Sequence, residues 1–257
     1  MNIIGIIPGR MASSRYPGKP LAKIAGIPMI GHCYFRSKMS QRLNEVYIAT
    51  CDKEIADYGD AVGARCVMTK DTHERATDRI AEAVDKIEAQ TGKRVDIVVM
   101  IQGDEPMTQP GMIDEAVEPL LKDNSIVIAN LMAPIMSREE HDDPNEVKVV
   151  VDRQGFALYF SREPIPSWRK GAKEVPMLKQ VCVIPFRRDF LKTFITLSPT
   201  PLEIIESVDM LRAMEHGYKV KMVMTKFESY SVDTPEDLQF AETYLLKDAL
   251  VAKYPKC

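Results

Sequence analysis

The sequence predicts an α/β protein with a mixed, mostly parallel central sheet, and three observations support this fold class. Apolar runs of strand length alternate with helical patterns over about the first 135 residues, as in proteins whose helices cover a parallel sheet. These runs are almost continuously apolar, which is typical of strands buried on both faces. After about residue 135 the pattern becomes β-rich. We therefore expect one domain, residues 1–257, with a β-rich insertion around residues 135–190.

The elements of the first half follow from apolar runs and from the residues that end them. NIIGIIP reads as a short buried strand that proline and glycine terminate. In the most strongly patterned helix, Thr77 is the expected N-cap and Gly92 the expected end. In chain order, the predicted strands are 2–8, 45–51, 65–69, 95–106 and 125–134, and the predicted helices are 28–39, 52–63, 77–92 and 111–122.

The second half begins with a predicted hairpin at 145–162, which turns around Asp152–Gly155. Its first strand shows period-2 character in Val147, Val149 and Val151. The remaining predicted elements are strands at 177–186 and 219–225, a helix at 201–217, and a turn leading into a C-terminal helix at 232–250.

Composition argues against several classes of protein. A formal net charge of −3 gives no reason to expect a nucleic-acid or membrane partner. No apolar run approaches the length of about 18 residues that suggests a membrane span, and the N-terminus lacks signal-peptide features. Five widely spaced cysteines without a C-x-x-C pair predict free thiols in a reducing cytoplasm. The four histidines lack metal-ligand spacing, which argues against zinc.

The loop PGRMASSRYPGKP follows the first predicted strand, where ligands collect in open parallel sheets. Its cations Arg10, Arg15 and Lys19 are solvated loop charges on one interpretation. On the other, glycines and serines beside three cations form a cradle for a polyphosphate. The loop matches neither the Walker A nor the G-x-G-x-x-G pattern, so both interpretations stay open.

Two further loops bring carboxylates to the ends of strands. Asp104 and Glu105, in QGDEP, follow an apolar run and can either cap the next helix or bind Mg²⁺ beside a phosphate loop. In VDTPEDL, Asp233 or Thr234 can cap the C-terminal helix. Paired with Asp104, Asp233 becomes a candidate second metal ligand.

The segment THERATDRIAE is a weaker candidate. His73, Arg75 and Arg79 precede or enter a helix whose N-terminus can face a ligand. A solvated first turn explains the same residues at least as well.

Together these motifs resemble the 3-deoxy-manno-octulosonate cytidylyltransferases, the CMP-KDO synthetases. The resemblance continues through ATDRIAEA, IQGDEPM, DPNEVKVVVD, ALYFSREPIP, TPLEIIESVDMLR and SVDTPEDL, in the family's order. It implies a Rossmann-like nucleotidyltransferase fold, Mg²⁺ as cofactor, a cytoplasmic homodimer, and an insertion that serves sugar binding and dimerisation. The implied reaction transfers CMP from CTP to a 2-keto-3-deoxy sugar acid for lipopolysaccharide or capsule synthesis, with no nucleic acid or membrane as partner.

The resemblance also implies residue roles. Lys19 is the expected charge stabiliser at the α-phosphate, beside Arg10, and Asp104 and Asp233 are the expected Mg²⁺ ligands. The expected CTP-binding residues are Pro8, Arg10, Ser13, Arg15, Lys19, Arg79 and Gln102, and the expected sugar-acid residues are Arg162, Gln180, Glu203 and Glu206.

One stretch, KQVCVIPF, departs from the family's His-x-Gly-x-Tyr-like run. Gln180 stands in place of histidine, Cys182 in place of glycine and Ile184 in place of tyrosine. Loss of two polar partners favours an altered acceptor. KDO, an amino-KDO such as the 8-amino form, and another ulosonic or nonulosonic acid therefore stay open, as does a catalytically silent nucleotide-binding module. Retention of Lys19, Asp104 and Asp233 argues against the silent module.

Overall fold

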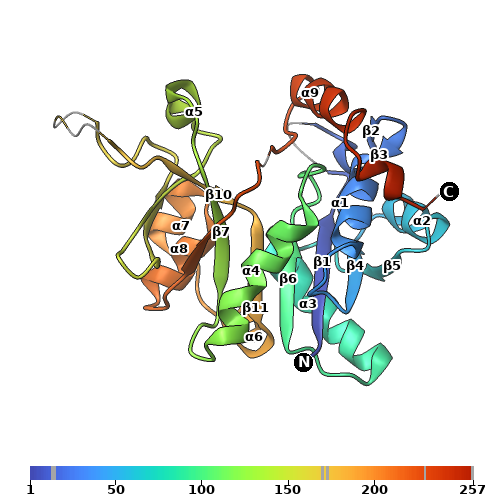
Figure 1. The fold of residues 1–257 in the computed structure, drawn as a ribbon. Coiled ribbons are helices and arrows are strands. Elements are labelled where there is room, and N and C mark those ends of the chain that lie inside the picture. Colours follow the sequence, from blue (N-terminus) through green and yellow to red (C-terminus); the bar gives the residue numbers. More distant parts are fainter. Residues whose placement is uncertain (13–15, 169–170, 172–173, 229, 256–257) are drawn as a thin grey trace. The chain divides into compact units, whose positions relative to one another are not determined.

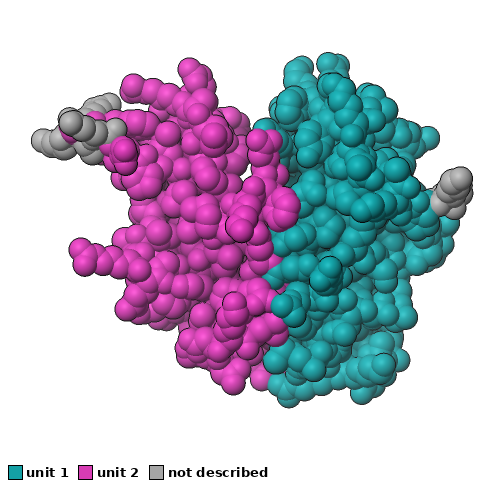
Figure 2. All heavy atoms as spheres, in the orientation of Figure 1, with its two compact units in different colours: residues 1–114, 229–257 teal, residues 115–228 magenta. Residues whose placement is uncertain are grey.

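The computed structural model describes residues 1–12, 16–168, 171, 174–228 and 230–255. The chain divides into two compact units (Figure 2). Unit 1 comprises Met1–Asp114 and Ser229–Cys257, and unit 2 comprises Glu115–Glu228. Because the N-terminal and C-terminal segments both belong to unit 1, residues more than 200 positions apart can contribute to one site there.

Four parallel strands of one sheet lie in unit 1, in the order β6-β1-β4-β5 (Figure 1). Every residue of β6 is buried, and all but one of the residues of β1 are. Burial on both faces explains the continuous apolar runs, and the mostly parallel α/β class is confirmed. The bounds are Ile3–Gly9 for β1, Glu45–Thr50 for β4, Arg65–Met68 for β5 and Ile97–Ile101 for β6.

The first three helices of unit 1 begin and end within two residues of the predicted positions, whereas the C-terminal helix ends five residues earlier than predicted. Gly92 ends α3 in the left-handed conformation, as expected, with φ of 65°. The predicted cap of α3 is wrong, because Arg75 occupies the N-cap position and Thr77 is buried inside the first turn. Thr234 caps α9 in a reciprocal capping box with Asp237. The bounds are Met29–Lys38 for α1, Lys53–Ala61 for α2, Ala76–Thr91 for α3 and Pro235–Leu245 for α9.

Shorter elements complete unit 1. The 3₁₀ segments are η1, Lys19–Leu21, and η2, Val251–Lys253, and the strands β2, Lys23–Ile24, and β3, Ile27–Pro28, form a small ribbon. Helix α4, Pro110–Lys122, starts in unit 1 and ends in unit 2.

A mixed sheet with the order β12-β7-β10-β8-β9 lies in unit 2. The pair β12–β7 is parallel and the other pairs are antiparallel. The predicted hairpin is confirmed as β8–β9, and the Asp152 carboxylate accepts from two backbone N–H groups of its turn. The strands are β7, Ala129–Pro134; β8, Lys148–Val151; β9, Ala157–Ser161; β10, Leu178–Val181; β11, Val183–Arg187; and β12, Lys221–Met224. The helices are α5, Arg138–Asp142; α6, Arg188–Phe194; α7, Pro201–Glu206; and α8, Asp209–Glu215.

Two predicted elements of unit 2 are each divided in the structure. The strand predicted at 177–186 breaks at Cys182 into β10 and β11. At this break the Asn130 side-chain amide donates a hydrogen bond to the Val181 carbonyl at 2.6 Å. The helix predicted at 201–217 breaks at Ser207, which has a left-handed φ of 53°. There the Glu206 carbonyl accepts from the Arg162 guanidinium at 2.6 Å, in place of a helical N–H.

Two expectations drawn from the composition can be compared with the described residues. Cys33, Cys51, Cys66 and Cys182 are free thiols, as predicted, and Cys257 lies outside the described part of the chain. No described helix has the length and the apolar character needed to cross a bilayer.

Candidate active site

The polar loops after β1 and β6 meet at the carboxyl edge of the parallel sheet in unit 1. The two strands are neighbours, so Pro8, near the end of β1, and Gln102, which follows β6, lie at the same edge. A Cβ added to Gly103 would lie 2.8 Å from the Pro8 carbonyl oxygen. Glycine at this position therefore allows the two loops to approach closely. The sequence analysis did not single out Gly103, although its position between Gln102 and Asp104 was a usable signal.

Lys19, Asp104 and Asp233 form an ion triad. The Lys19 Nζ lies 2.7 Å from Asp104 Oδ2 and 3.0 Å from Asp233 Oδ1, and only 8% of the lysine is exposed. The Val232 N–H also donates to the Asp104 carbonyl at 2.9 Å, which ties the two acidic segments together. Neither aspartate caps a helix: α4 starts at Pro110, and Thr234 caps α9.

The electrostatics of the triad favour a charged lysine. Burial by itself would lower the pKa of Lys19, but the charges and hydrogen bonds of Asp104 and Asp233 outweigh it and raise the pKa above its ordinary value. The triad therefore holds a charged lysine between two carboxylates.

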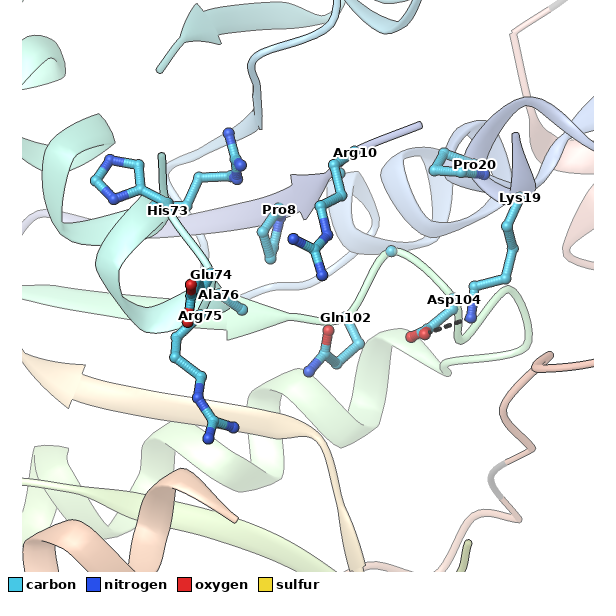
Figure 3. Close-up of a pocket in the computed structure, with 13 residues that line it drawn as sticks. Pro8, Arg10, Lys19, Pro20, His73, Glu74, Arg75, Ala76, Gln102 and Asp104 are labelled. Atoms are coloured by element: carbon cyan, nitrogen blue, oxygen red, sulfur yellow. Dashed lines mark hydrogen bonds and ion pairs between the residues drawn. The ribbon is translucent and has the colours of Figure 1, made fainter. Parts of the chain in front are cut away.

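A cavity of about 280 Å³ opens beside the triad (Figure 3). In Figure 3, Pro8 and Arg10 lie at the end of β1, Gln102 follows β6, and a dashed line joins Lys19 to Asp104. The cations Arg10, Lys19, Arg75 and Arg79 outnumber the acids Glu74 and Asp104 in the lining, so the cavity favours an anionic ligand. The full lining is Pro8, Gly9, Arg10, Lys19, Pro20, His73, Glu74, Arg75, Ala76, Arg79, Gln102, Gly103 and Asp104.

Arg79 gives the most specific sign of an anion site. Its side chain is buried, with 3% of the residue exposed, and Nη1 donates to Thr69 Oγ1 at 2.5 Å and to the Lys70 carbonyl at 3.3 Å. Its Nη2 is buried without a hydrogen-bond partner among the described residues. A buried charged donor without a partner costs stability, and an anion in the cavity would satisfy it.

The loop that carries Arg75 is fixed by Glu82, which the sequence analysis missed. The Glu82 carboxylate accepts from His73, from the Lys70 N–H at 3.0 Å and from Lys86, whose Nζ lies 2.8 Å away. Burial would raise the pKa of Glu82, but the hydrogen bonds from Lys86, the Lys70 backbone and His73 lower it to about 2. The carboxylate is therefore an anionic anchor for this side of the cavity.

The structure thus brings most of the predicted nucleotide residues to one place. Pro8, Arg10, Lys19, Arg79, Gln102 and Asp104 line the cavity, and Asp233 joins through Lys19. The predicted residues Ser13 and Arg15 lie outside the described part of the chain.

The predicted sugar-acid residues belong to unit 2, where two of them are linked. The Glu206 carboxylate accepts from the Arg162 N–H at 2.7 Å and from the hydroxyls of Tyr159 and Ser161. Through these bonds Glu206 holds the end of β9.

The other two predicted sugar-acid residues have separate partners. Glu203 is buried and makes a bidentate pair with Arg212, at 2.6 and 2.8 Å. The side-chain nitrogen of Gln180 donates to Asn130 Oδ1 at 2.5 Å.

The donor set of the triad fits Mg²⁺. Two carboxylate oxygens lie within 3.0 Å of one ammonium nitrogen, so they are close enough to share one cation. Mg²⁺ uses one or two carboxylates and completes its shell with water and phosphate oxygens. Among the residues described, no group of three or more His, Cys, Asp and Glu side chains is placed to hold a metal.

Comparison with known proteins points in the same direction. The cytidylyltransferase family model matches residues 4–225. A relative from Geobacter metallireducens, named 3-deoxy-manno-octulosonate cytidylyltransferase, is 45% identical over 248 residues, which cover 93% of this chain and 95% of the relative. A relative of the same name from Syntrophobacter fumaroxidans is 44% identical and is matched over 98% of this chain and 100% of its own length.

Solved structures agree with the sequence comparisons. A CMP:2-keto-3-deoxy-manno-octonic acid synthetase complexed with CTP superposes with a TM-score of 0.89 at 36% identity, covering 96% of this chain and 99% of that chain. A 4-diphosphocytidyl-2C-methyl-D-erythritol synthase from Anaerococcus prevotii, at 13% identity and a TM-score of 0.64, shares the fold. The chain belongs to the cytidylyltransferase family and, within it, to the 3-deoxy-manno-octulosonate cytidylyltransferases.

Proposed function

We propose that this chain transfers CMP from CTP to the anomeric hydroxyl of 3-deoxy-manno-octulosonate (KDO), releases pyrophosphate, and uses Mg²⁺. The observation that carries this proposal is the ion triad of Lys19, Asp104 and Asp233 beside a cation-lined cavity. The names of the relatives favour KDO as the acceptor over other ulosonic acids.

The cavity residues account for the nucleotide half of the reaction. A triphosphate is a polyanion, and Arg10, Lys19 and Arg79 supply cations for it from three different segments. Arg79 Nη2, which has no hydrogen-bond partner in the described part of the chain, provides a buried donor. We assign Gln102 and Pro8 to nucleotide contacts, and Ser13 and Arg15 to the same set on the resemblance.

In the proposed reaction the anomeric oxygen forms a bond to the α-phosphorus as the bond from that phosphorus to the leaving oxygen breaks. The bonding electrons leave with pyrophosphate, and the hydroxyl proton passes to solvent or a base. Phosphoryl transfer of this kind requires positioning and charge neutralisation, and no protein nucleophile. The Lys19 ammonium is the proposed counter-charge at the α-phosphate.

Asp104 and Asp233 are the residues that would hold Mg²⁺. When bound, the ion would neutralise phosphate charge. The Lys19 ammonium and the hydrogen bond from the Val232 N–H to the Asp104 carbonyl hold the two carboxylates close together.

The assignment of residues to the sugar-acid acceptor rests on the resemblance to the 3-deoxy-manno-octulosonate cytidylyltransferases. Arg162, Gln180, Glu203 and Glu206 stay the predicted sugar-acid residues, and the segment around 135–190 stays the predicted sugar-binding and dimerisation insertion. A homodimer and a cytoplasmic location are likewise expectations.

Pyrophosphate release tests the proposal, measured with CTP, Mg²⁺ and a panel that contains KDO, 8-amino-KDO and a nonulosonic acid. We expect the fastest release with KDO. Faster pyrophosphate release with another acid would overturn the assignment of KDO as the acceptor. If no acid on the panel supports release, the proposed enzymatic function is wrong.

Two substitutions test the metal ligands in the same assay. Asp104→Asn and Asp233→Asn should each lower the rate by about two orders of magnitude or more with the fold retained by circular dichroism. Glu236→Gln, at an exposed position in the first turn of α9, is the matched control and should keep the wild-type rate. Unchanged turnover in either aspartate variant would contradict the metal assignment.

A further inference from the structure

Arg36 on α1 is a fully buried cation outside the cavity lining, and its guanidinium joins three parts of unit 1. Nε donates to the Tyr254 hydroxyl at 2.9 Å, Nη2 pairs with the Asp248 carboxylate, and Nη1 reaches the Met107 carbonyl at 3.4 Å. Tyr254 and Asp248 belong to the C-terminal segment, whereas Met107 lies three residues after Asp104. A buried guanidinium is tolerated only when its donors are satisfied, so Arg36 depends on both the C-terminal segment and the segment that carries Met107.

His32 extends the network in one direction. Its Nε2 lies 2.8 Å from the Ile24 carbonyl, which can only accept, so this nitrogen carries the proton. Its Nδ1 lies 3.2 Å from the Tyr254 hydroxyl. Burial lowers the pKa of His32 and so favours the neutral imidazole, in which Nδ1 accepts from the Tyr254 hydroxyl while that oxygen accepts from Arg36. The chain of donors therefore runs from Arg36 through Tyr254 to His32 and on to Ile24.

A buried apolar cluster connects this network to the ion triad. It packs the C-terminal helix against the segments that carry the two carboxylates, because Met107 follows Asp104 closely and Val232 immediately precedes Asp233. Val232 also donates its N–H to the Asp104 carbonyl. The members of the cluster are Ile24, Met29, Met107, Val232, Ala241 and Leu245.

We infer that Arg36, with Tyr254 and Asp248, positions the Asp104 and Asp233 carboxylates by locking the C-terminal segment onto α1. The inference rests on the proposed function of that carboxylate pair. Arg36 acts through the Met107 carbonyl and through the apolar cluster, without contact to the triad itself. If the contacts of Arg36 with the C-terminal segment are weakened, the two carboxylates lose their fixed separation, and metal binding weakens before the fold is lost.

Tyr254→Phe is the sharpest test, because it removes one hydroxyl and keeps the ring that packs against Phe35 and His32. We expect the variant to weaken Mn²⁺ binding in the presence of CTP by about tenfold, as for groups that orient metal ligands. The Mg²⁺ concentration that gives half-maximal pyrophosphate release should rise equally. The matched control is Tyr244→Phe, at an exposed position on α9, which should leave both values at wild type.

These readouts separate positioning from mere stability. All measurements are made well below the melting temperature of each variant, where a purely structural role would leave the Mg²⁺ dependence unchanged. Wild-type metal affinity in folded Tyr254→Phe would overturn the inference. If that variant does not fold, Asp248→Asn, which keeps the shape of the Arg36 partner, replaces it with the same expected and contradicting outcomes. Absence of CTP turnover in the wild type would instead overturn the proposed function.

Discussion

The Lys19 ammonium lies 2.7 Å from the Asp104 carboxylate and also pairs with Asp233, so one buried cation holds two acids together. These are the same carboxylates that the proposed function assigns to Mg²⁺. A metal ion and an ammonium group cannot occupy one position between two carboxylates, and their charges repel. The lysine is therefore an internal counter-ion whose departure would accompany metal binding.

Replacement of Lys19 by methionine should increase metal affinity in the absence of nucleotide. The change removes the competing charge and leaves two carboxylates uncompensated, so Mn²⁺ should bind about tenfold more tightly, within the usual range of coupling between two ligands. CMP transfer should be lost in the same variant. Electron paramagnetic resonance of free Mn²⁺ measures the affinity directly.

Two controls accompany the Lys19 variant. Lys23→Met changes an exposed lysine four residues away and should keep wild-type Mn²⁺ affinity. Adding Asp104→Asn to Lys19→Met should abolish the gain. Equal or weaker Mn²⁺ binding in Lys19→Met would show that the lysine does not compete with the metal.

Gly103 should tolerate no side chain, because the neighbouring atom belongs to backbone. An added Cβ would lie 2.8 Å from the Pro8 carbonyl oxygen, so Gly103→Ala must move the loop that carries Asp104. We expect a loss of about 1–3 kcal/mol in the free energy of unfolding, together with weaker CTP binding. Gly5→Ala is the contrast, since its nearest atom is the end of the flexible Leu43 side chain at 2.7 Å. A Gly103→Ala protein as stable as wild type would mean that the loops can separate freely.

The sequence predicted those parts of the site whose signals are local. Asp104 lies three residues after β6, and Lys19 lies ten residues after β1, so parallel-sheet geometry was enough to place them at one edge. A cap at Asp233 or Thr234 was predicted because Pro235 and acidic residues follow, and the structure shows that Thr234 is the cap.

Features that depend on distant partners could not be predicted. The break at Ser207 coincides with a bond from Arg162, 44 residues earlier in the chain than its acceptor at Glu206. Arg36 joins Tyr254 across 218 residues, and nothing near either residue in the sequence indicates the other. Local patterns specify an element and its exposed face, whereas the choice between a continuous and a divided element was decided by tertiary hydrogen bonds.

Arg79→Lys should selectively weaken CTP binding. The substitution keeps a positive charge but removes the forked geometry that leaves Nη2 available while Nη1 bonds Thr69 and Lys70. Loss of one charged hydrogen bond corresponds to a rise in the KM for CTP of about tenfold or more, with a smaller change in kcat. Arg65→Lys, outside the cavity, is the matched control. An unchanged KM for CTP would contradict the assignment of Nη2 to the nucleotide.

His32 should make the stability of the protein fall in mildly acidic solution. Burial lowers the pKa of His32 most strongly, and the Arg36 charge lowers it further. The hydrogen bond to the Ile24 carbonyl and the Asp248 charge raise the pKa, but they do not outweigh the lowering. The unfolded chain therefore binds a proton at higher pH than the folded protein does. The stabilisation is complete above the ordinary histidine pKa of about 6.5 and is lost as the pH falls from there toward the lowered folded-state value. The slope from this one group cannot exceed about 1.4 kcal/mol per pH unit.

Urea unfolding between pH 8 and pH 5 measures the free energy of unfolding as a function of pH. In His32→Gln the amide can donate to Ile24 and accept from Tyr254, and the variant should flatten this dependence below pH 6.5. His216→Gln removes an imidazole at an exposed position, so the difference between the two variants isolates the buried group. Parallel curves for wild type and His32→Gln would mean that the pKa of His32 is the same in the folded and unfolded protein.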